Sequence, residues 1–258
     1  MNSFLDRRRA MPPVCVIGAI GLVLSGLAAV PAQAQVIVAP NVFGATKGGS
    51  QANTAPFNNI SRYQQIYAAS QFSALSGPEL ITQIAFRPSV QQNAFTYTDS
   101  SIQFDLSTTK ETVAGLSSTF AANVGSNDQV VHSGALTLTS TGTPGGGAAG
   151  PFDAVVTLTT PFLYDPTQGN LVLDIRNFAT PATKIFIDGG GDPSTALVFV
   201  DNSTSAAMGT VQPFGLSTQF TFAPVPEAST TVSFGLLLAL GMGGLVFAAQ
   251  RKKAHAKA

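Results

Sequence analysis

Two stretches decide the fold class: Ile102-Gln103-Phe104-Asp105-Leu106 and Leu171-Val172-Leu173-Asp174-Ile175-Arg176. In both, large apolar residues recur at every second position. Successive side chains of a β-strand point to opposite faces, so this alternation predicts strands with one buried face. Phe220 and Phe222 alternate in the same way with the polar residues beside them. The sequence therefore indicates a β-rich domain.

Further short runs of this type lie on both sides of these stretches, and segments rich in Gly, Pro and Asp separate them. No internal repeat is present, and a helical pattern occurs only at 112–123. We therefore expect an all-β domain, a two-sheet sandwich of jelly-roll type. The further strands are expected at 36–39, 60–67, 80–87, 130–138, 154–159, 184–188 and 197–200, with turns at 142–151, 165–169 and 189–191 and a long loop at 139–150.

The C-terminal part of the chain contains an uncharged apolar run at 232–249, followed directly by Arg251, Lys252 and Lys253. At about 1.5 Å of rise per residue, a helix of some 18–20 residues crosses a hydrocarbon core of roughly 30 Å. The positive-inside rule places a basic end in the cytoplasm. This arrangement predicts a transmembrane helix. The three basic residues would stop its translocation and keep the end of the chain in the cytoplasm.

The N-terminal part has the features of a secretory signal peptide. Arginines at 7–9 precede an apolar stretch at 14–30, and Ala32 and Ala34 occupy the small-residue positions before a cleavage site. Cleavage after Ala34 leaves Gln35 as the new N-terminus. The residues after the arginines favour the general secretory route over the twin-arginine route.

The segment before the apolar run has a recognisable motif. Val225, Pro226, Glu227, Ser229 and Thr230 match the Val-Pro-Glu-Pro-Ser-Thr pattern of bacterial PEP-CTERM proteins, and Ala228 replaces the second proline. With the apolar run and the basic end, the chain resembles that family over about its last 35 residues. The resemblance implies a sorting signal that a membrane-embedded exosortase reads, in Gram-negative bacteria that make exopolysaccharide. It implies an inner-membrane anchor with a periplasmic ectodomain, which reaches the cell surface or the exterior after processing.

These segments predict five parts of the chain. They are a signal peptide at 1–34, a β-sandwich ectodomain at 35–223, a stalk with the sorting motif at 224–231, a transmembrane helix at 232–249 and a basic cytoplasmic tail at 250–258.

The charge of the ectodomain excludes one class of ligand. The whole chain has 13 basic and 13 acidic residues. Without the charged residues of the two terminal segments, six basic and eleven acidic residues remain, a net charge of −5. This balance argues against nucleic acid as a partner. The single cysteine, Cys15, lies in the signal peptide, so the domain relies on its hydrophobic core and not on disulfides.

Catalytic side chains are scarce in the ectodomain. His132 is its one histidine, which leaves little material for a serine triad or a multi-histidine metal site. Asp188 and Asp192 flank three glycines and are the candidate calcium ligands; the alternative is a turn in which both aspartates bond to the backbone. No other cofactor is expected. Tyr63, Tyr67 and Tyr97 are either an exposed carbohydrate platform or part of the core edge.

The function that these features indicate is that of an exported, non-enzymatic cell-envelope or extracellular-matrix protein. Its expected partners are the membrane, an exosortase-like processing enzyme and polysaccharide or other matrix components. The alternative is a secreted hydrolase acting on glycan, which requires two carboxyl groups facing one cleft.

Overall fold

A computed structural model describes residues 34–226, apart from residues 54–55, 91, 144–147 and 182 and the side chains of 49–53. Within this part of the chain, no helix has the length and apolar character needed to cross a membrane. Several predicted features lie outside the described residues: the signal peptide up to residue 33 with Ala32, the membrane segment 232–249, the basic tail, and Glu227, Ser229, Thr230, Arg251, Lys252 and Lys253.

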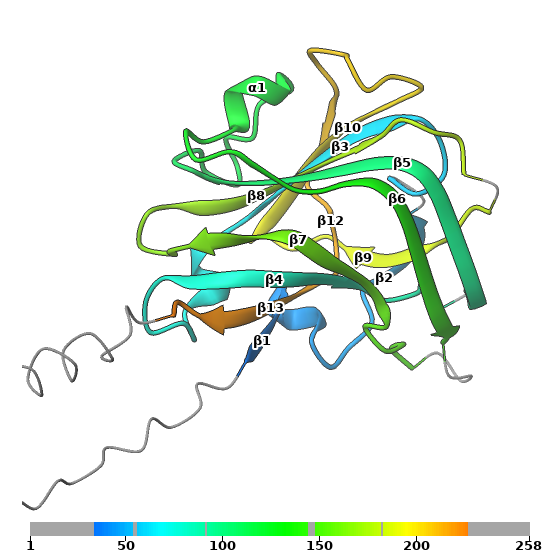
Figure 1. Cartoon of the computed structure of the whole chain (residues 1–258), viewed down its shortest axis with the longest axis horizontal. Helices are drawn as coiled ribbons and strands as arrows, with labels where there is room; N and C mark the ends of the chain where they lie inside the picture. Colours follow the sequence, from blue (N-terminus) through cyan, green and yellow to red (C-terminus); the bar gives the residue numbers. More distant parts are fainter. Residues whose placement is uncertain (1–33, 54–55, 91, 144–147, 182, 227–258) are drawn as a thin grey trace, which may run out of the picture. The chain divides into compact units, whose positions relative to one another are not determined.

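Two antiparallel sheets face each other in a sandwich-like arrangement (Figure 1). The smaller sheet has the order β1-β13-β4-β7, and the alternation predicted around Phe220 is confirmed, because Phe220 and Phe222 are buried while Gln219 and Thr221 are partly exposed. The C-terminal strand of the domain thus lies between two others. The strands of this sheet are β1 (Gln35–Ala39), β4 (Glu79–Phe86), β7 (Ala154–Tyr164) and β13 (Thr218–Pro224).

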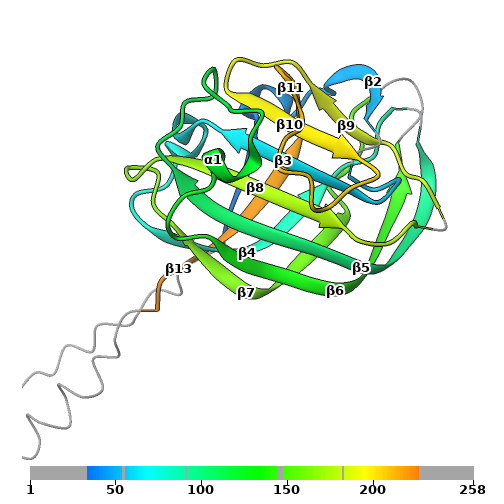
Figure 2. The same ribbon diagram turned by 90° about the horizontal axis from the view of Figure 1, so that it is seen from above.

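The larger sheet has the order β11-β10-β3-β8-β5-β6 (Figure 2). Ile102, Phe104 and Leu106 point into the core as predicted, whereas β8 is buried on both faces. The second face of β8 is buried because the connection between β5 and β6, residues 110–128, packs across it. The strands are β3 (Ser61–Tyr67), β5 (Asn93–Thr109), β6 (Gln129–Gly142), β8 (Asn170–Asn177), β10 (Thr195–Asp201) and β11 (Thr210–Gln212).

A small third sheet corrects the prediction of a turn at 189–191. Gly189 and Gly190 belong to β9 (Ile187–Gly190), which lies between β12 (Gly215–Leu216) and β2 (Gly49–Asn53). A Cβ atom on Gly189 would lie 2.5 Å from the carbonyl oxygen of Gly215. The glycines therefore allow close approach of two backbones, a role that glycine also has inside strands.

Aromatic side chains fill the space between the two large sheets. Phe72, in the short helix η2 (Ala69–Phe72), packs edge to face against Tyr164, Phe220 and Phe222, with ring centroids 5.0, 5.6 and 6.0 Å away. Edge-to-face contacts of this kind add to the stabilisation from burial. A second short helix, η1 (Asn41–Phe43), follows β1.

The three tyrosines form part of this core. Tyr63, Tyr67 and Tyr97 are fully buried, and the hydroxyl of Tyr67 lies 2.7 Å from that of Thr218. Of the two alternatives for these residues, the core position is confirmed and the carbohydrate platform is wrong, because a buried ring cannot present its face to a sugar.

One helix prediction and one loop prediction need adjustment. Of the possible helix at 112–123, only α1 (Phe120–Asn123) is helical. Strand β6 continues to Gly142, which pairs with Asn93, so the first residues of the loop predicted at 139–150 are strand.

Candidate functional site

Asp188, one of the two candidate calcium ligands, lies in a buried ion pair. The whole residue is 3% exposed. Its carboxylate accepts a hydrogen bond of 2.6 Å from Nε of Arg87. The backbone N–H of Gly48 and the hydroxyl of Ser217 donate to the same carboxylate, at 3.0 and 3.3 Å. Both of its oxygens therefore already have protein donors.

Asp192, the other candidate, starts a turn. Its Oδ1 accepts a hydrogen bond from the backbone N–H of Ser194 at 2.9 Å, and its carbonyl accepts one from Thr195 at 3.1 Å. These contacts favour the turn alternative at Asp192 and an ion-pair role for Asp188. Calcium binding by the two residues stays a prediction. Across the described residues, no three His, Cys, Asp or Glu side chains are grouped so as to hold a metal ion.

His132 lies on β6 beside Phe104, with ring centroids 5.8 Å apart. Neither ring nitrogen has a hydrogen-bond partner in the described part of the chain. Burial lowers the pKa of His132. A histidine with no carboxylate or hydroxyl bonded to it is not arranged as the base of a catalytic triad.

A group of four charged side chains, joined by ion pairs, lies on the outer face of the larger sheet. Strand alternation and register place Gln64, Asp174 and Asp105 in one row across β3, β8 and β5, and place Arg62, Arg176 and Gln103 in the next. We call Arg62, Asp105, Asp174 and Arg176 the outer charge cluster.

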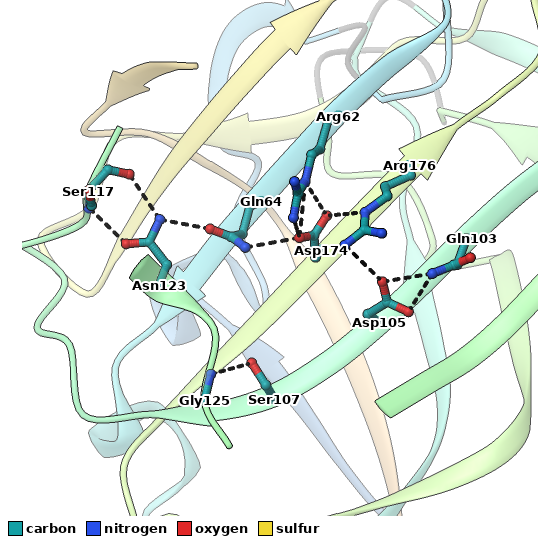
Figure 3. Close-up of polar contacts among 10 residues, drawn as sticks. All are labelled: Arg62, Gln64, Gln103, Asp105, Ser107, Ser117, Asn123, Gly125, Asp174 and Arg176. Carbon is teal, nitrogen blue, oxygen red and sulfur yellow. Dashed lines mark hydrogen bonds and ion pairs between the residues drawn. The ribbon is translucent and has the colours of Figure 1, made fainter. Parts of the chain in front are cut away.

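Asp174 is the centre of the outer charge cluster (Figure 3). It accepts hydrogen bonds from Arg62, whose terminal nitrogen lies 2.6 Å from Oδ2, and from the amide of Gln64 at 3.0 Å. Arg176 lies 3.7 Å from both Asp174 and Asp105, and the amide of Gln103 donates to Asp105 at 2.9 Å. Each carboxylate thus has a nearby cation and at least one donor.

The 110–128 connection covers one side of this cluster. Phe120 of α1 lies under the guanidinium of Arg62, 4.4 Å from ring centroid to Cζ. The fully buried Asn123 donates to the side chain of Gln64 at 2.8 Å and also bonds to Ser117 in both directions. Apolar side chains of the connection, including Leu116, pack on Val172 next to the charges. The cluster therefore holds the connection to the sheet.

Burial changes the acidity of the cluster. It raises the pKa of Asp105 from 3.8 to about 6, while the hydrogen bonds from Gln103 and the charge of Arg176 act in the lowering direction. Burial also raises the pKa of Asp128, at the end of the connection. A carboxyl group that titrates near neutral pH has the property that a general acid needs.

The carboxyl pair of Asp105 and Asp174 is nevertheless closed to a substrate in this structure. The two residues are register partners, yet each is only 2% exposed. Both are neutralised by arginines, as expected for buried structural ion pairs. The arrangement supports a structural role for the pair more than hydrolysis.

A pH prediction follows for Asp105. The pKa of Asp105 in the folded protein lies above its value in the unfolded chain, so the folded protein binds a proton at this carboxyl more tightly. Proton binding therefore stabilises the fold at low pH. This stabilisation is lost as pH rises through about 6. We expect Asp105→Asn to be more stable than wild type at pH 8 by about 1–2 kcal/mol and to show no such gain at pH 4. The full pKa shift of Asp105 corresponds to roughly 3 kcal/mol. The expected gain is smaller because solvent screens the charges near Arg176, whose side chain is partly exposed.

Thermal unfolding of both proteins between pH 4 and 8 measures this difference. Asp201→Asn, at an exposed position at the end of β10, is the matched control and should follow wild type. A difference between Asp105→Asn and wild type that does not change with pH would contradict the assignment.

The sequence pattern did not identify the outer charge cluster. The alternation correctly places Asp105 and Asp174 opposite core residues, but it predicts them on a solvent-exposed face. The only sign of the cluster in the sequence is that each of three strands has a charged residue on its polar face. Register between strands far apart in sequence, which brings these charges into contact, is not visible in the pattern.

No model of a known protein family matches the chain, and no curated protein matches it significantly.

Proposed function

We propose that the chain is an exported, non-enzymatic cell-envelope or extracellular-matrix protein, sorted by its PEP-CTERM-like tail. The observation that carries the proposal is the order of the terminal segments: a signal peptide with cleavage after Ala34, and then, behind the domain, the Val225–Thr230 motif, the apolar run and the basic stop. An exosortase-like enzyme and the membrane are the partners that this order implies.

The geometry of the domain ends supports the proposal. Strand β1 begins at Gln35, the residue after the predicted cleavage site, and pairs with Phe222 near the end of β13. Val225 and Pro226, the first residues of the motif, are exposed. Both processing sites would thus adjoin the same end of the sandwich, outside its core.

We also propose a jelly-roll type of sandwich. Strands β3, β8 and β5 are antiparallel neighbours although they are far apart in the chain, and the first and last strands pair with each other. Neighbours of this kind arise when long hairpins wrap around a sandwich.

Export makes a direct prediction about the mature protein. We expect it to begin at Gln35, because Ala32 and Ala34 fit the cleavage site. N-terminal sequencing of protein from the membrane or extracellular fraction checks this. Protein in those fractions that still begins at Met1 would contradict export by a cleaved signal.

Glycan hydrolysis is the second candidate, and one observation favours it: the raised pKa of Asp105 next to Asp174. Release of reducing sugar from polysaccharide by wild type, abolished in Asp105→Asn, would replace the non-enzymatic proposal. We expect no release by either protein, because both carboxyl groups are buried.

A further inference from the structure

Gln35 is the residue that the proposed signal-peptide cleavage leaves as the N-terminus. It is the first residue of β1 and pairs with Phe222 of β13, beside which β1 lies in Figure 1. Strand β1 is at the edge of the smaller sheet, so β13 is its only neighbouring strand in the described part of the chain. The new N-terminus therefore coincides with the start of an edge strand.

The side chain of Gln35 is not held by other groups. It is partly exposed and helps to line a surface pocket of about 310 Å³ beside β1. Two other lining residues bond to each other, because the backbone N–H of Asn41 donates to the side chain of Gln71 at 2.6 Å. Among the described residues, the side-chain amide of Gln35 has no hydrogen-bond partner. It is therefore free to turn toward the backbone nitrogen of its own residue.

An N-terminal glutamine contains a nucleophile and an electrophile in one residue. The α-amine nitrogen attacks Cδ of the side-chain amide, and the bond between Cδ and Nε2 breaks. A proton passes from the attacking nitrogen to the leaving nitrogen, and ammonia is released. The product is the five-membered lactam of pyroglutamate. An α-amino group has an ordinary pKa of about 7.7–8.0, so about a tenth of it is the neutral nucleophile at pH 7. The intramolecular geometry favours the attack.

The fold is compatible with this reaction. The ring closes by rotation about the Cα–Cβ and Cβ–Cγ bonds of Gln35, and the backbone after its Cα atom does not need to move. The pairs of Val36 with Thr221 and of Ile37 with Phe220 are therefore kept. Before cleavage the same nitrogen is in the peptide bond to Ala34 and is not a nucleophile. Cyclisation at this residue thus requires the cleavage.

The lactam suits this place in the sheet. Phe222, the register partner of Gln35, is fully buried. A charged ammonium group next to a buried residue loses hydration, whereas an uncharged lactam loses less. The lactam also has no free α-amine, which aminopeptidases require. Protection of this end matters because β1 contributes Ile37 and Ala39 to the core.

We propose that Gln35 is a modification site, at which the N-terminus of the mature protein cyclises to pyroglutamate and caps β1. The inference rests on the proposed function, because it requires export with cleavage after Ala34. It goes beyond that function by assigning a covalent change to the exported domain. The reaction is an intramolecular aminolysis of an amide and uses no oxidant, reductant or cofactor.

The test uses the full chain, expressed with its signal peptide and isolated from the membrane fraction of a Gram-negative host. Free amines are acetylated immediately, so an α-amine that is free in the protein is recorded before it can react. Trypsin then cleaves only after arginine, and the N-terminal peptide is 35–62. By mass spectrometry we expect most of this peptide to lack one ammonia and to have no acetyl group on its α-nitrogen.

The matched control is Gln35→Asn. Asparagine keeps the amide but has one methylene fewer, so the same attack would have to close a strained four-membered ring. Nearly all of the control peptide should therefore have an acetylated α-amine. Treatment of the unlabelled proteins with an aminopeptidase should shorten the Gln35→Asn variant and leave wild type at full length.

The outcomes separate this inference from the proposed function. A wild-type peptide that begins at Gln35 with an acetylated α-amine would overturn the cap and leave export intact. A mature chain that begins at Met1 or at any other residue would overturn both. Equal shortening of wild type and Gln35→Asn by the aminopeptidase would contradict the cap as well.

Discussion

Arg87→Met is expected to lower the free energy of unfolding by about 3–5 kcal/mol, because it leaves Asp188 as an unpaired buried charge. The side chain of Arg87 is 1% exposed and its terminal nitrogen lies 2.5 Å from Oδ2 of Asp188. The same guanidinium donates to the carbonyl of Thr46 and lies over the ring of Phe152, 5.0 Å from its centroid. Methionine keeps much of the apolar stem but none of these polar contacts.

The loss should be large because the ion pair joins several segments. Arg87 follows β4, Asp188 is in β9, and the carboxylate also holds Gly48 and Ser217. The backbones of Arg87 and Asp188 are hydrogen-bonded as well, at 3.0 Å. The pair therefore links the small third sheet to the smaller sheet of the sandwich.

Chemical denaturation at pH 7 measures this loss. Lys110→Met, at an exposed position that bonds only to the carbonyl of Gln168 among the described residues, is the control and should change stability by less than about 1 kcal/mol. Adding Asp188→Asn to Arg87→Met removes the unpaired charge and should recover part of the loss. A double variant with the summed loss of the two single variants would contradict the ion-pair account.

Glu227→Ala is expected to abolish most processing of the tail while leaving membrane insertion intact. In the proposed function Glu227 belongs to the motif that the exosortase recognises, and it lies outside the apolar run at 232–249 that is expected to cross the membrane. Gel mobility and the membrane fraction in a host with an exosortase measure the two effects separately. Processing of Glu227→Ala at the wild-type level would remove the support for the motif and leave only the anchor.

The counterpart is the joint change of Arg251, Lys252 and Lys253 to neutral residues. Each basic residue costs about 2.5–3.5 kcal/mol at the centre of a membrane helix, so together they hold the end of the chain inside. We expect the triple variant to lose stable anchoring or orientation, with more protein outside the membrane fraction. The two variants should therefore fail in different ways.

The sequence predicts the strands well and their contacts poorly. Alternation at residues 102–106, 171–176 and 219–222 identifies β5, β8 and β13, because the side-chain period of a strand is a local property. The third sheet was missed because Gly189 and Gly190 have the composition of a turn. Their strand conformation depends on a close approach to Gly215, which is 25 residues or more away in the chain.

The charged groups show the same limit. Asp188 is next to three glycines in the sequence and suggests a loop ligand, but its partner Arg87 directly follows β4, 101 residues earlier in the chain. The outer charge cluster likewise depends on the register between strands. The signal peptide, the sorting motif and the apolar run differ in this respect. Each is a contiguous stretch of sequence that an enzyme or a membrane recognises without the folded domain.

The most direct measurement for the sorting of this chain is its fate in paired hosts, with and without an exosortase. We predict that wild type begins at Gln35 in both hosts. Only with the exosortase should it lose the basic C-terminal end and leave the inner-membrane fraction. Mass spectrometry of the purified protein identifies both ends. A chain that keeps Arg251–Lys253 and the same membrane fraction in both hosts would contradict the account.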